Sequence, residues 1–172
     1  MVSQTRALDQ WSSATQNELL NFSKEFDKVY QAANDIIDIL DYTKDLTFAS
    51  LVKLDHVLYI ERGYMAASQG DESYLKAISV GHHDCRLGKW YDEGYGKKAF
   101  SRVPAYKALE SPHAKVHALV QKAVEQSRRD WVHDESALSS IVQTMRGAEK
   151  ESHVVMDILT NMVEEKKKIS EK

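Results

Sequence analysis

The stretch LSSIVQTMRGAEKESHVVMDILTNM, residues 138–162, decides the fold class of this chain. Its apolar and small residues recur at alternating intervals of three and four positions: Leu138, Ile141, Met145, Ala148, Ser152, Val155, Leu159 and Met162. Residues with this spacing lie along one face of an α-helix. Such a face is stable when it packs against other helices, so the stretch predicts a helical bundle or a coiled coil.

A second face with the same spacing, the N-terminal seam, lies nearer the start of the chain. It consists of Leu19, Phe22, Phe26, Val29, Ala33, Ile36 and Leu40. The polar window Asp41–Asp45 interrupts the pattern and predicts either a kink or a continuous helix with a changed face. Beyond it we expect an apolar stripe made of Leu46, Leu51, Leu54, Leu58 and Met65. Gly70 suits a helix C-cap, so this helical region, which starts near Ser12, should end there.

The middle of the chain, residues 72–103, is less regular. Residues 72–80 predict one short helix, and the four glycines that follow leave room only for short helices, one of them carrying residues 85–91. Ser111-Pro112 is typical of the start of a helix, which would run to about Asp130 or Asp134. Alternatively, that helix begins at Pro104 and is kinked at Pro112.

These patterns together predict an all-α fold, because no segment shows the alternation of a strand and the chain has only 2 Pro and 7 Gly. We expect an antiparallel helical bundle of the four-helix type with coiled-coil arms. Seams of this length usually pair with a second copy, so we expect a homodimer. The alternative is that the two seams bury each other within one monomer.

Composition excludes several classes of function. The net charge of −3 and a pI near 6.2 provide no basic surface for nucleic acid. No apolar run is long enough to span a bilayer, so we expect no direct membrane insertion. The single cysteine, Cys85, cannot form an intrachain disulfide and suits a reducing compartment. The simplest localisation is therefore cytoplasmic.

Four residues are candidate metal ligands: His56, Cys85, His113 and His117. His113 and His117 stand four positions apart, so on a helix they share one face. A lone cysteine is usually a small buried hydrophobe, and a histidine pair on a helix often arises by chance. Together, however, three imidazoles and one thiolate form the ligand set of a tetrahedral zinc (Zn²⁺) site.

The other histidines have no comparable partnership. His82 and His83 are close enough to Cys85 in sequence to be spare ligands or to support the ligands, whereas His133 and His153 are expected to be ordinary exposed side chains. For all four, an exposed or capped histidine is the default interpretation.

Three motifs resemble those of the chemoreceptor zinc-binding (CZB) domain of bacteria. They are Lys-Leu-Asp-His at 53–56, Cys-Arg-Leu-Gly-Lys-Trp-Tyr at 85–91 and Pro-His-Ala-Lys-Val-His at 112–117. The resemblance covers residues 46–135, and the cysteine motif is its most specific part. It implies an all-helical, often dimeric domain with zinc bound by His56, Cys85, His113 and His117. Residues 1–45 are then an N-terminal arm, similar to the coiled coil that precedes this domain in soluble chemoreceptors, and residues 136–172 are a C-terminal helix with a charged tail that frays at its end.

The resemblance also implies a sensory function. Family members regulate chemotaxis receptors or diguanylate cyclases in response to zinc or to hypochlorous acid and related oxidants. Coordination to zinc would hold Cys85 as a thiolate, the form that oxidants attack, so Cys85 is the predicted redox-reactive residue. Asp55 and Asp84 are candidates to accept the second N–H of a ligating histidine, and Trp90 is a candidate to shield the metal, although core packing explains it equally well.

Two other interpretations of the metal ligands remain. The first is a purely structural zinc in a coiled-coil adaptor, with Cys85 inert. The second is a zinc hydrolase, which four protein ligands disfavour, because catalytic zinc keeps one position open for water. No His-Glu-x-x-His motif or phosphate-binding loop is present, so we expect a protein that is not an enzyme. A di-iron bundle would need more carboxylate and histidine pairs than the sequence offers.

Overall fold

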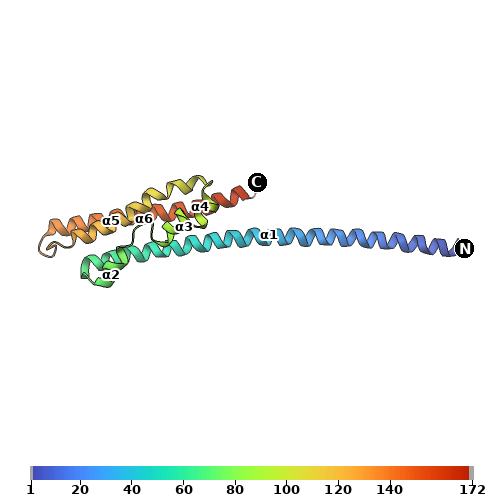
Figure 1. Cartoon of the computed structure of the whole chain (residues 1–172), viewed down its shortest axis with the longest axis horizontal. Coiled ribbons are helices and arrows are strands. Elements are labelled where there is room, and N and C mark those ends of the chain that lie inside the picture. Colours follow the sequence, from blue (N-terminus) through green and yellow to red (C-terminus); the bar gives the residue numbers. More distant parts are fainter. Residues whose placement is uncertain (1, 171–172) are drawn as a thin grey trace. The chain divides into compact units, whose positions relative to one another are not determined.

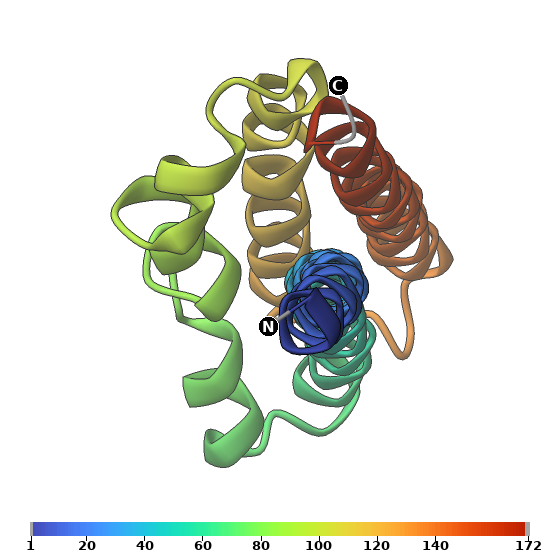
Figure 2. The ribbon, with the colours of Figure 1, turned by 90° about the vertical axis from the view of Figure 1, so that its right-hand side faces the viewer.

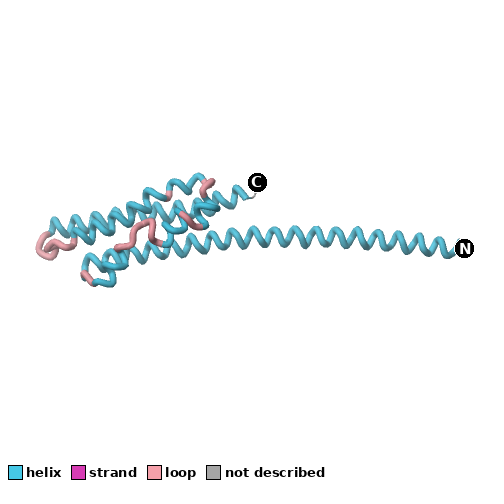
Figure 3. Tube along the Cα trace, viewed as in Figure 1, coloured by secondary structure: helices cyan, strands magenta, loops and turns pink. Residues whose placement is uncertain are grey.

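The computed structural model describes residues 2–170, and every regular element within them is helical. The elements are α1 (Val2–Gln69), α2 (Glu72–Ile78), α3 (Arg86–Asp92), α4 (Tyr95–Phe100), the 3-10 helix η1 (Pro104–Ala108), α5 (Glu110–Gln126) and α6 (Glu135–Ser170), shown in Figures 1 and 3. The predicted all-α class is confirmed. The chain divides into two compact units, Met1–Lys44 and Asp45–Lys172. Among the described helices, none is long and apolar enough to cross a membrane.

Within residues 45–172, hydrogen bonds define the direction of each long helix. Lys53 Nζ of α1 donates to Thr160 Oγ1 of α6 over 2.5 Å, and the Tyr64 hydroxyl of α1 donates to Glu149 Oε1 of α6 over 2.9 Å. As the residue number rises along α1 it falls along α6, so these two helices are antiparallel. Lys166 of α6 also pairs with Asp45, extending the same register.

The helix α5 runs antiparallel to α6 and parallel to α1. Gln126 of α5 donates to Ser140 of α6 over 2.9 Å, near the loop that joins these two helices. A parallel pair needs a long connection, and residues 70–109 provide it with their short helices. Figure 2 shows the first part of this connection, drawn in green, on one side of α5, and α6, drawn in red, on the other. The bundle therefore has three long helices and a fourth side made of short ones.

The buried face of α6 is the one predicted from its sequence. From Ile141 to Met162 every residue of the predicted set is buried, and only Leu138 at the start is exposed. The side chains of the N-terminal seam, in contrast, are exposed in the single chain; Phe26, for example, is 60 % exposed.

The buried face of α1 within residues 45–69 differs from the predicted stripe. Leu46, Leu51 and Leu54 are exposed. The buried residues are instead Asp45, Ala49, Val52, His56, Tyr59, Gly63 and Ala66. Several of these are small, which lets neighbouring helices approach α1 closely. A Cβ atom added at Gly63 would lie 2.6 Å from Val120 Cγ1 of α5.

The helix α1 continues without interruption through residues 41–45, which is one of the two predicted alternatives. The helix boundaries correct four other expectations. The helix α1 begins at Val2 rather than near Ser12. The helix α5 begins at Glu110, directly after η1, so Ser111 lies inside it and is not its N-cap. It ends at Gln126, four residues before the nearer of the two predicted ends. The predicted fraying tail is helical through Ser170, and residues 171–172 lie outside the described part of the chain.

Candidate metal centre

Two long helices bring three histidines into the interior of the 45–172 unit. His56 lies on the buried face of α1, and His113 and His117 lie one turn apart on the buried face of α5; each is at most 5 % exposed. The ring centres of His56 and His113 are 5.3 Å apart, and those of His113 and His117 are 5.1 Å apart. Two imidazoles that share one tetrahedral zinc ion, each about 2.1 Å from it through nitrogen, have ring centres about 5.2 Å apart. The spacing of these two pairs of rings, each of which includes His113, is therefore that of two ligands of one ion.

Cys85 approaches the histidines from the short-helix segment. Its Sγ lies 3.3 Å from Nε2 of His113, close to the separation of about 3.5 Å expected for sulfur and nitrogen on one zinc ion. Cys85 is the N-cap of α3, and its sulfur accepts a hydrogen bond from the Gly88 N–H over 3.3 Å. A side chain at Gly88 is excluded, because an added Cβ would lie 2.0 Å from the carbonyl oxygen of His82.

Main-chain carbonyls orient two of the histidine rings. Nδ1 of His56 lies 2.9 Å from the Val52 carbonyl oxygen, and Nδ1 of His117 lies 2.9 Å from that of Val80. A carbonyl oxygen can only accept, so in both rings Nδ1 carries the proton and Nε2 carries the lone pair. This is the arrangement that metal-binding histidines usually show.

The Nε2 atom of His56 is buried and finds no hydrogen-bond partner within residues 2–170. A buried polar atom of this kind normally costs stability, and buried polar groups are nearly always paired. A cation held jointly with His113 would satisfy this nitrogen. The unpaired nitrogen therefore agrees with a donor set that holds a metal ion.

The surroundings keep the three imidazoles neutral, the form that binds metal. Burial, together with the neighbouring imidazoles of His56 and His117, lowers the pKa of His113 to about 2. Burial also lowers the pKa of His117 to about 4 and lowers the pKa of His56. For Cys85, burial raises the pKa of the thiol and outweighs the N–H groups of Gly88 and Leu87, which lower it. Without a metal, Cys85 is therefore a thiol at neutral pH.

The structure brings three of the four predicted ligands into one tight group. The ligand atoms of Cys85, His113 and His117 all lie within 4.8 Å of one another. His56 is not included in that group, although its ring is a neighbour of His113.

A comparison with known protein families matches this region. Residues 56–124, which begin at His56 and include Cys85, His113 and His117, match the family described as the chemoreceptor zinc-binding domain. This segment of the chain belongs to the CZB family. The match covers about two fifths of the 172 residues. No curated protein and no solved structure matches the chain. The CZB family is one of regulatory zinc-binding domains rather than of catalytic ones.

A cavity of about 270 Å³ adjoins the candidate ligands of the CZB domain. His56, Cys85 and His117 line it, together with Arg62 and Arg86. Both arginines are exposed, so the cavity connects the Cys85 sulfur with the surface. Small molecules thus have a route to the one thiol of the chain.

The expected roles of Asp55, Asp84 and Trp90 beside the ligands stay predictions, and Asp55 lines the cavity that adjoins His56, Cys85 and His117. Asp55 forms an ion pair with Arg86, with 3.0 Å between Oδ2 and Nε, and it accepts no recorded hydrogen bond from His56 among the described residues. Asp84 lies in the turn before Cys85, where its N–H donates to Gly81. Trp90 stacks on Phe48 at 4.8 Å and is buried in the core of the 45–172 unit, which agrees with the core-packing alternative.

Sequence analysis did not identify Tyr59 or Val80 as parts of the site. The Tyr59 ring lies 4.4 Å from the ring of His117, and its hydroxyl donates to the Ile78 carbonyl oxygen over 3.0 Å. These contacts connect α1 to the end of α2 and so hold the Val80 carbonyl against His117. The position of Tyr59, three residues after His56 on the same helix face, was the one available signal.

Proposed function

We propose that this CZB domain binds one zinc ion through Nε2 of His56, His113 and His117 and Sγ of Cys85. The observation that supports this most directly is the 3.3 Å separation of Cys85 Sγ and His113 Nε2 beside the unpaired Nε2 of His56. When bound, zinc would act as a Lewis acid that holds Cys85 as a thiolate at neutral pH.

The proposed function is sensing of zinc availability or of oxidants. The three histidines belong to long helices, whereas Cys85 is the N-cap of the seven-residue helix α3. Such a segment opens at lower cost than the bundle around it. The donors of the three histidines would therefore stay in place when Cys85 leaves, and the residues that follow Cys85 would move.

Oxidation of Cys85 is the second input that we propose. In its thiolate form the sulfur gives two electrons to hypochlorous acid and takes its oxygen, yielding sulfenic acid and chloride. The cavity lined by Arg62 and Arg86 supports this step, because it gives a small oxidant access to the sulfur. A sulfenic acid is a weaker donor than a thiolate, so oxidation would release the segment that begins at Cys85.

The output would pass to a signalling partner of the chemotaxis or cyclic-di-GMP type, with the domain acting as part of a homodimer. The exposed N-terminal seam supports this proposal, because an apolar heptad face of that length usually pairs with another helix. The long helix α1 carries both the seam and His56, so a change at the metal ligands would act on the helix that leads to the partner.

The test measures zinc and oxidant response in matched variants of the whole chain. The parent protein should bind one tight equivalent of zinc. Cys85→Ala removes a direct ligand, so it should bind zinc at least about 100-fold more weakly, the upper end of the loss for an outer partner, and show no oxidant-dependent zinc release. His133→Ala, which changes an exposed histidine, is the control and should behave as the parent. A Cys85→Ala protein that releases zinc with oxidant as the parent does would overturn the redox proposal.

The alternative of a purely structural zinc predicts a different result in the same experiment. The parent would still bind tightly, but Cys85 in the zinc-loaded protein would not react with hypochlorous acid at amounts that leave methionines intact. Thiol labelling after graded exposure to the oxidant separates these two outcomes.

A further inference from the structure

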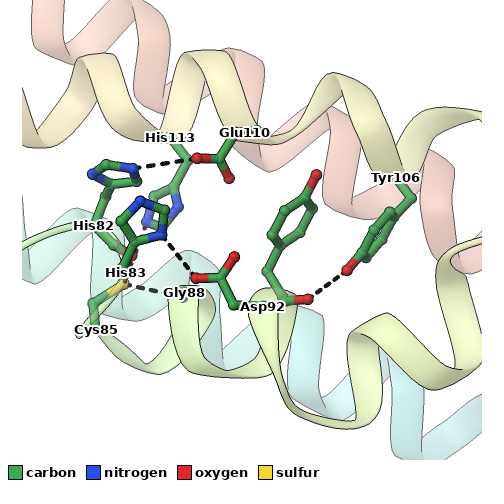
Figure 4. Close-up of polar contacts among 9 residues, drawn as sticks. His82, His83, Cys85, Gly88, Asp92, Tyr106, Glu110 and His113 are labelled. Carbon is green, nitrogen blue, oxygen red and sulfur yellow. Dashed lines mark hydrogen bonds and ion pairs between the residues drawn. The ribbon is translucent and has the colours of Figure 1, made fainter.

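A second cluster of metal-binding side chains lies beside the first. We propose that His82, His83 and Glu110 form a solvent-facing site for a divalent cation of the zinc class, separate from the candidate ligands His56, Cys85, His113 and His117. Figure 4 shows the two imidazoles and the Glu110 carboxylate gathered at the start of α5, with Asp92 beyond His83. This proposal does not depend on the function proposed for the buried set.

The three side chains present donors at distances that suit one ion. One ligand atom from each of His82, His83 and Glu110 lies within 4.8 Å of the others. Nε2 of His82 is 3.3 Å from Oε1 of Glu110. Two donors that share a tetrahedral zinc ion, each about 2.1 Å away, lie about 3.4 Å apart. This pair can therefore hold an ion with almost no movement.

Asp92 orients the third donor. Nδ1 of His83 lies 2.8 Å from Oδ2 of Asp92, so this nitrogen carries the proton and leaves Nε2 as the lone pair. A carboxylate behind a histidine is a usual support for a metal ligand, because it fixes the tautomer and raises the basicity of the ring. The carboxylates of Asp92 and Glu110 also balance the charge of a divalent cation.

The main chain under the cluster is held in place by α3. A Cβ atom added at Gly88 would lie 2.6 Å from the Cα atom of His83 and 2.0 Å from the carbonyl oxygen of His82. The first turn of α3 is thus packed directly on the 82–83 backbone. Glu110 comes from the first residue of α5, so both sides of the cluster rest on helices.

The side chains themselves remain open to solvent. The exposed fraction of the side chain is 27 % for His82 and 60 % for His83, against at most 5 % for the buried histidines. The ring centres of His82 and His83 are only 3.9 Å apart, so the exposed His83 ring has to turn away from His82 when both bind one ion. We therefore expect a weaker and faster-exchanging site than the buried one.

The donor types indicate which cation binds. Imidazole and carboxylate suit zinc, nickel and copper and disfavour calcium and magnesium, which prefer all-oxygen sites. His82 also lies 5.8 Å from the ring of His113, measured between ring centres, so the two sites are neighbours. They share no donor, because the second site uses no sulfur and none of the four candidate ligands of the first.

The experiment counts metal equivalents in the whole chain after chelator treatment. Titration with Zn²⁺ alone should show two equivalents, the second weaker than the first. Titration with Co²⁺ should show a sulfur-to-metal charge-transfer band that grows during only one equivalent, since one site has no thiolate. The paired variant His82→Gln with His83→Gln should weaken the second equivalent by about tenfold or more and leave the first unchanged.

Matched variants separate this proposal from the one for the buried set. The pair His133→Gln with His153→Gln removes two exposed histidines elsewhere and should retain both equivalents; His133 also pairs with a carboxylate, 3.1 Å away in Asp130. Cys85→Ala should weaken the sulfur-containing equivalent and leave the other. If the paired variant at 82 and 83 fails to fold, His83→Gln alone, at an exposed position, tests the same site and should also weaken the second equivalent. A second equivalent that is missing from the parent, or that survives in the 82/83 pair, overturns the second site.

Discussion

At the scale of single residues, His56 is a candidate ligand that lowers the stability of the metal-free protein. Its buried Nε2 has no protein partner within the described residues, which costs about 1–3 kcal/mol when no cation is bound. We predict that His56→Leu, which removes the unpaired nitrogen, unfolds at the same or a higher temperature than the parent in the presence of a chelator.

With zinc bound, the parent should unfold at a higher temperature than His56→Leu. The parent should gain thermal stability from the ion, because a ligand that binds only the folded state stabilises it. His56→Leu should gain little. Thermal unfolding of both proteins with and without zinc checks the prediction, and an equal zinc-dependent gain in both would remove His56 from the ligand set.

Gly88 is a second residue whose replacement has a defined effect. Gly88→Ala places a Cβ atom 2.0 Å from the His82 carbonyl oxygen, so α3 has to shift and take Cys85 with it. We predict a loss of about 1–3 kcal/mol in the free energy of unfolding and weaker zinc binding. Gly147→Ala is the matched control. Gly147 lies inside α6, and a Cβ atom added there would meet only Leu119 Cδ1 of α5, at 3.5 Å. Because alanine favours a helix more than glycine does, Gly147→Ala should stabilise the protein by up to about 1 kcal/mol. Urea unfolding of both variants would show whether the free energy of unfolding falls in Gly88→Ala and rises in Gly147→Ala.

The buried histidines also make the metal-free protein sensitive to acid. The pKa of His117 is lowered from 6.5 to about 4 in the folded protein. Between these values the unfolded chain takes up a proton and the folded protein does not, so stability falls as the pH falls. The loss is at most about 1.4 kcal/mol per pH unit for each such histidine. Unfolding of chelator-treated protein from about pH 7.5 to about pH 4.5 should show this slope, and His117→Gln should reduce it. A stability that does not change across this range would contradict the prediction.

At the scale of helices, the small residues on the buried face of α1 determine how closely the bundle packs. Ala49 is 3 % exposed, and the space beside it, lined by Trp90, Leu159 and Met162, is only about 10 Å³. Ala49→Leu should therefore lower the free energy of unfolding by about 1–3 kcal/mol. Leu54→Ala, on the exposed face of the same helix, should change it by no more than about 0.5 kcal/mol. If urea unfolding showed a larger loss in the free energy of unfolding for Leu54→Ala than for Ala49→Leu, the assignment of the buried face would be wrong.

The same helices show why part of the fold could be predicted from the sequence. The face of α6 is regular and mostly large and apolar, so its spacing alone identified it, and Ile141 and Leu159 are buried as expected. In α1 the leucines suggested a stripe, but burial follows the residues that allow close approach, such as Ala49 and Gly63. Small residues carry little hydrophobic signal, so the sequence pattern favoured the wrong face.

The candidate ligands also differ in how far the sequence could predict them. The pair His113 and His117 could be predicted because one rigid helix fixes their relation. His56 and Cys85 lie outside that helix, so only the chemistry of a zinc ligand set and the family motifs associated them with the pair. The carbonyl of Val80 could not be predicted at all, because its position depends on how the end of α2 packs against Tyr59. Main-chain hydrogen-bond acceptors leave no signature in a sequence.

At the scale of the whole molecule, the exposed N-terminal seam is the feature that the single chain leaves unexplained. Six of its seven residues are large apolar side chains, each exposed by more than half of its surface. A surface of this kind is unfavourable in water and is typical of an interaction site. The heptad spacing favours pairing with the same helix of a second copy. We therefore expect the chain to be a dimer through this seam.

Two glutamates placed in the seam test this expectation. Phe26→Glu with Ile36→Glu puts four carboxylates into the dimer interface, where charge is poorly solvated, and should raise the dissociation constant by about two orders of magnitude. The control pair Asn17→Asp with Gln31→Glu adds the same charge on the opposite side of the helix and should leave the dimer intact. Sedimentation velocity over a range of concentrations measures both. A parent chain that sediments as a monomer throughout, or a seam variant that dimerises as the control does, means that another surface joins the copies or that none does.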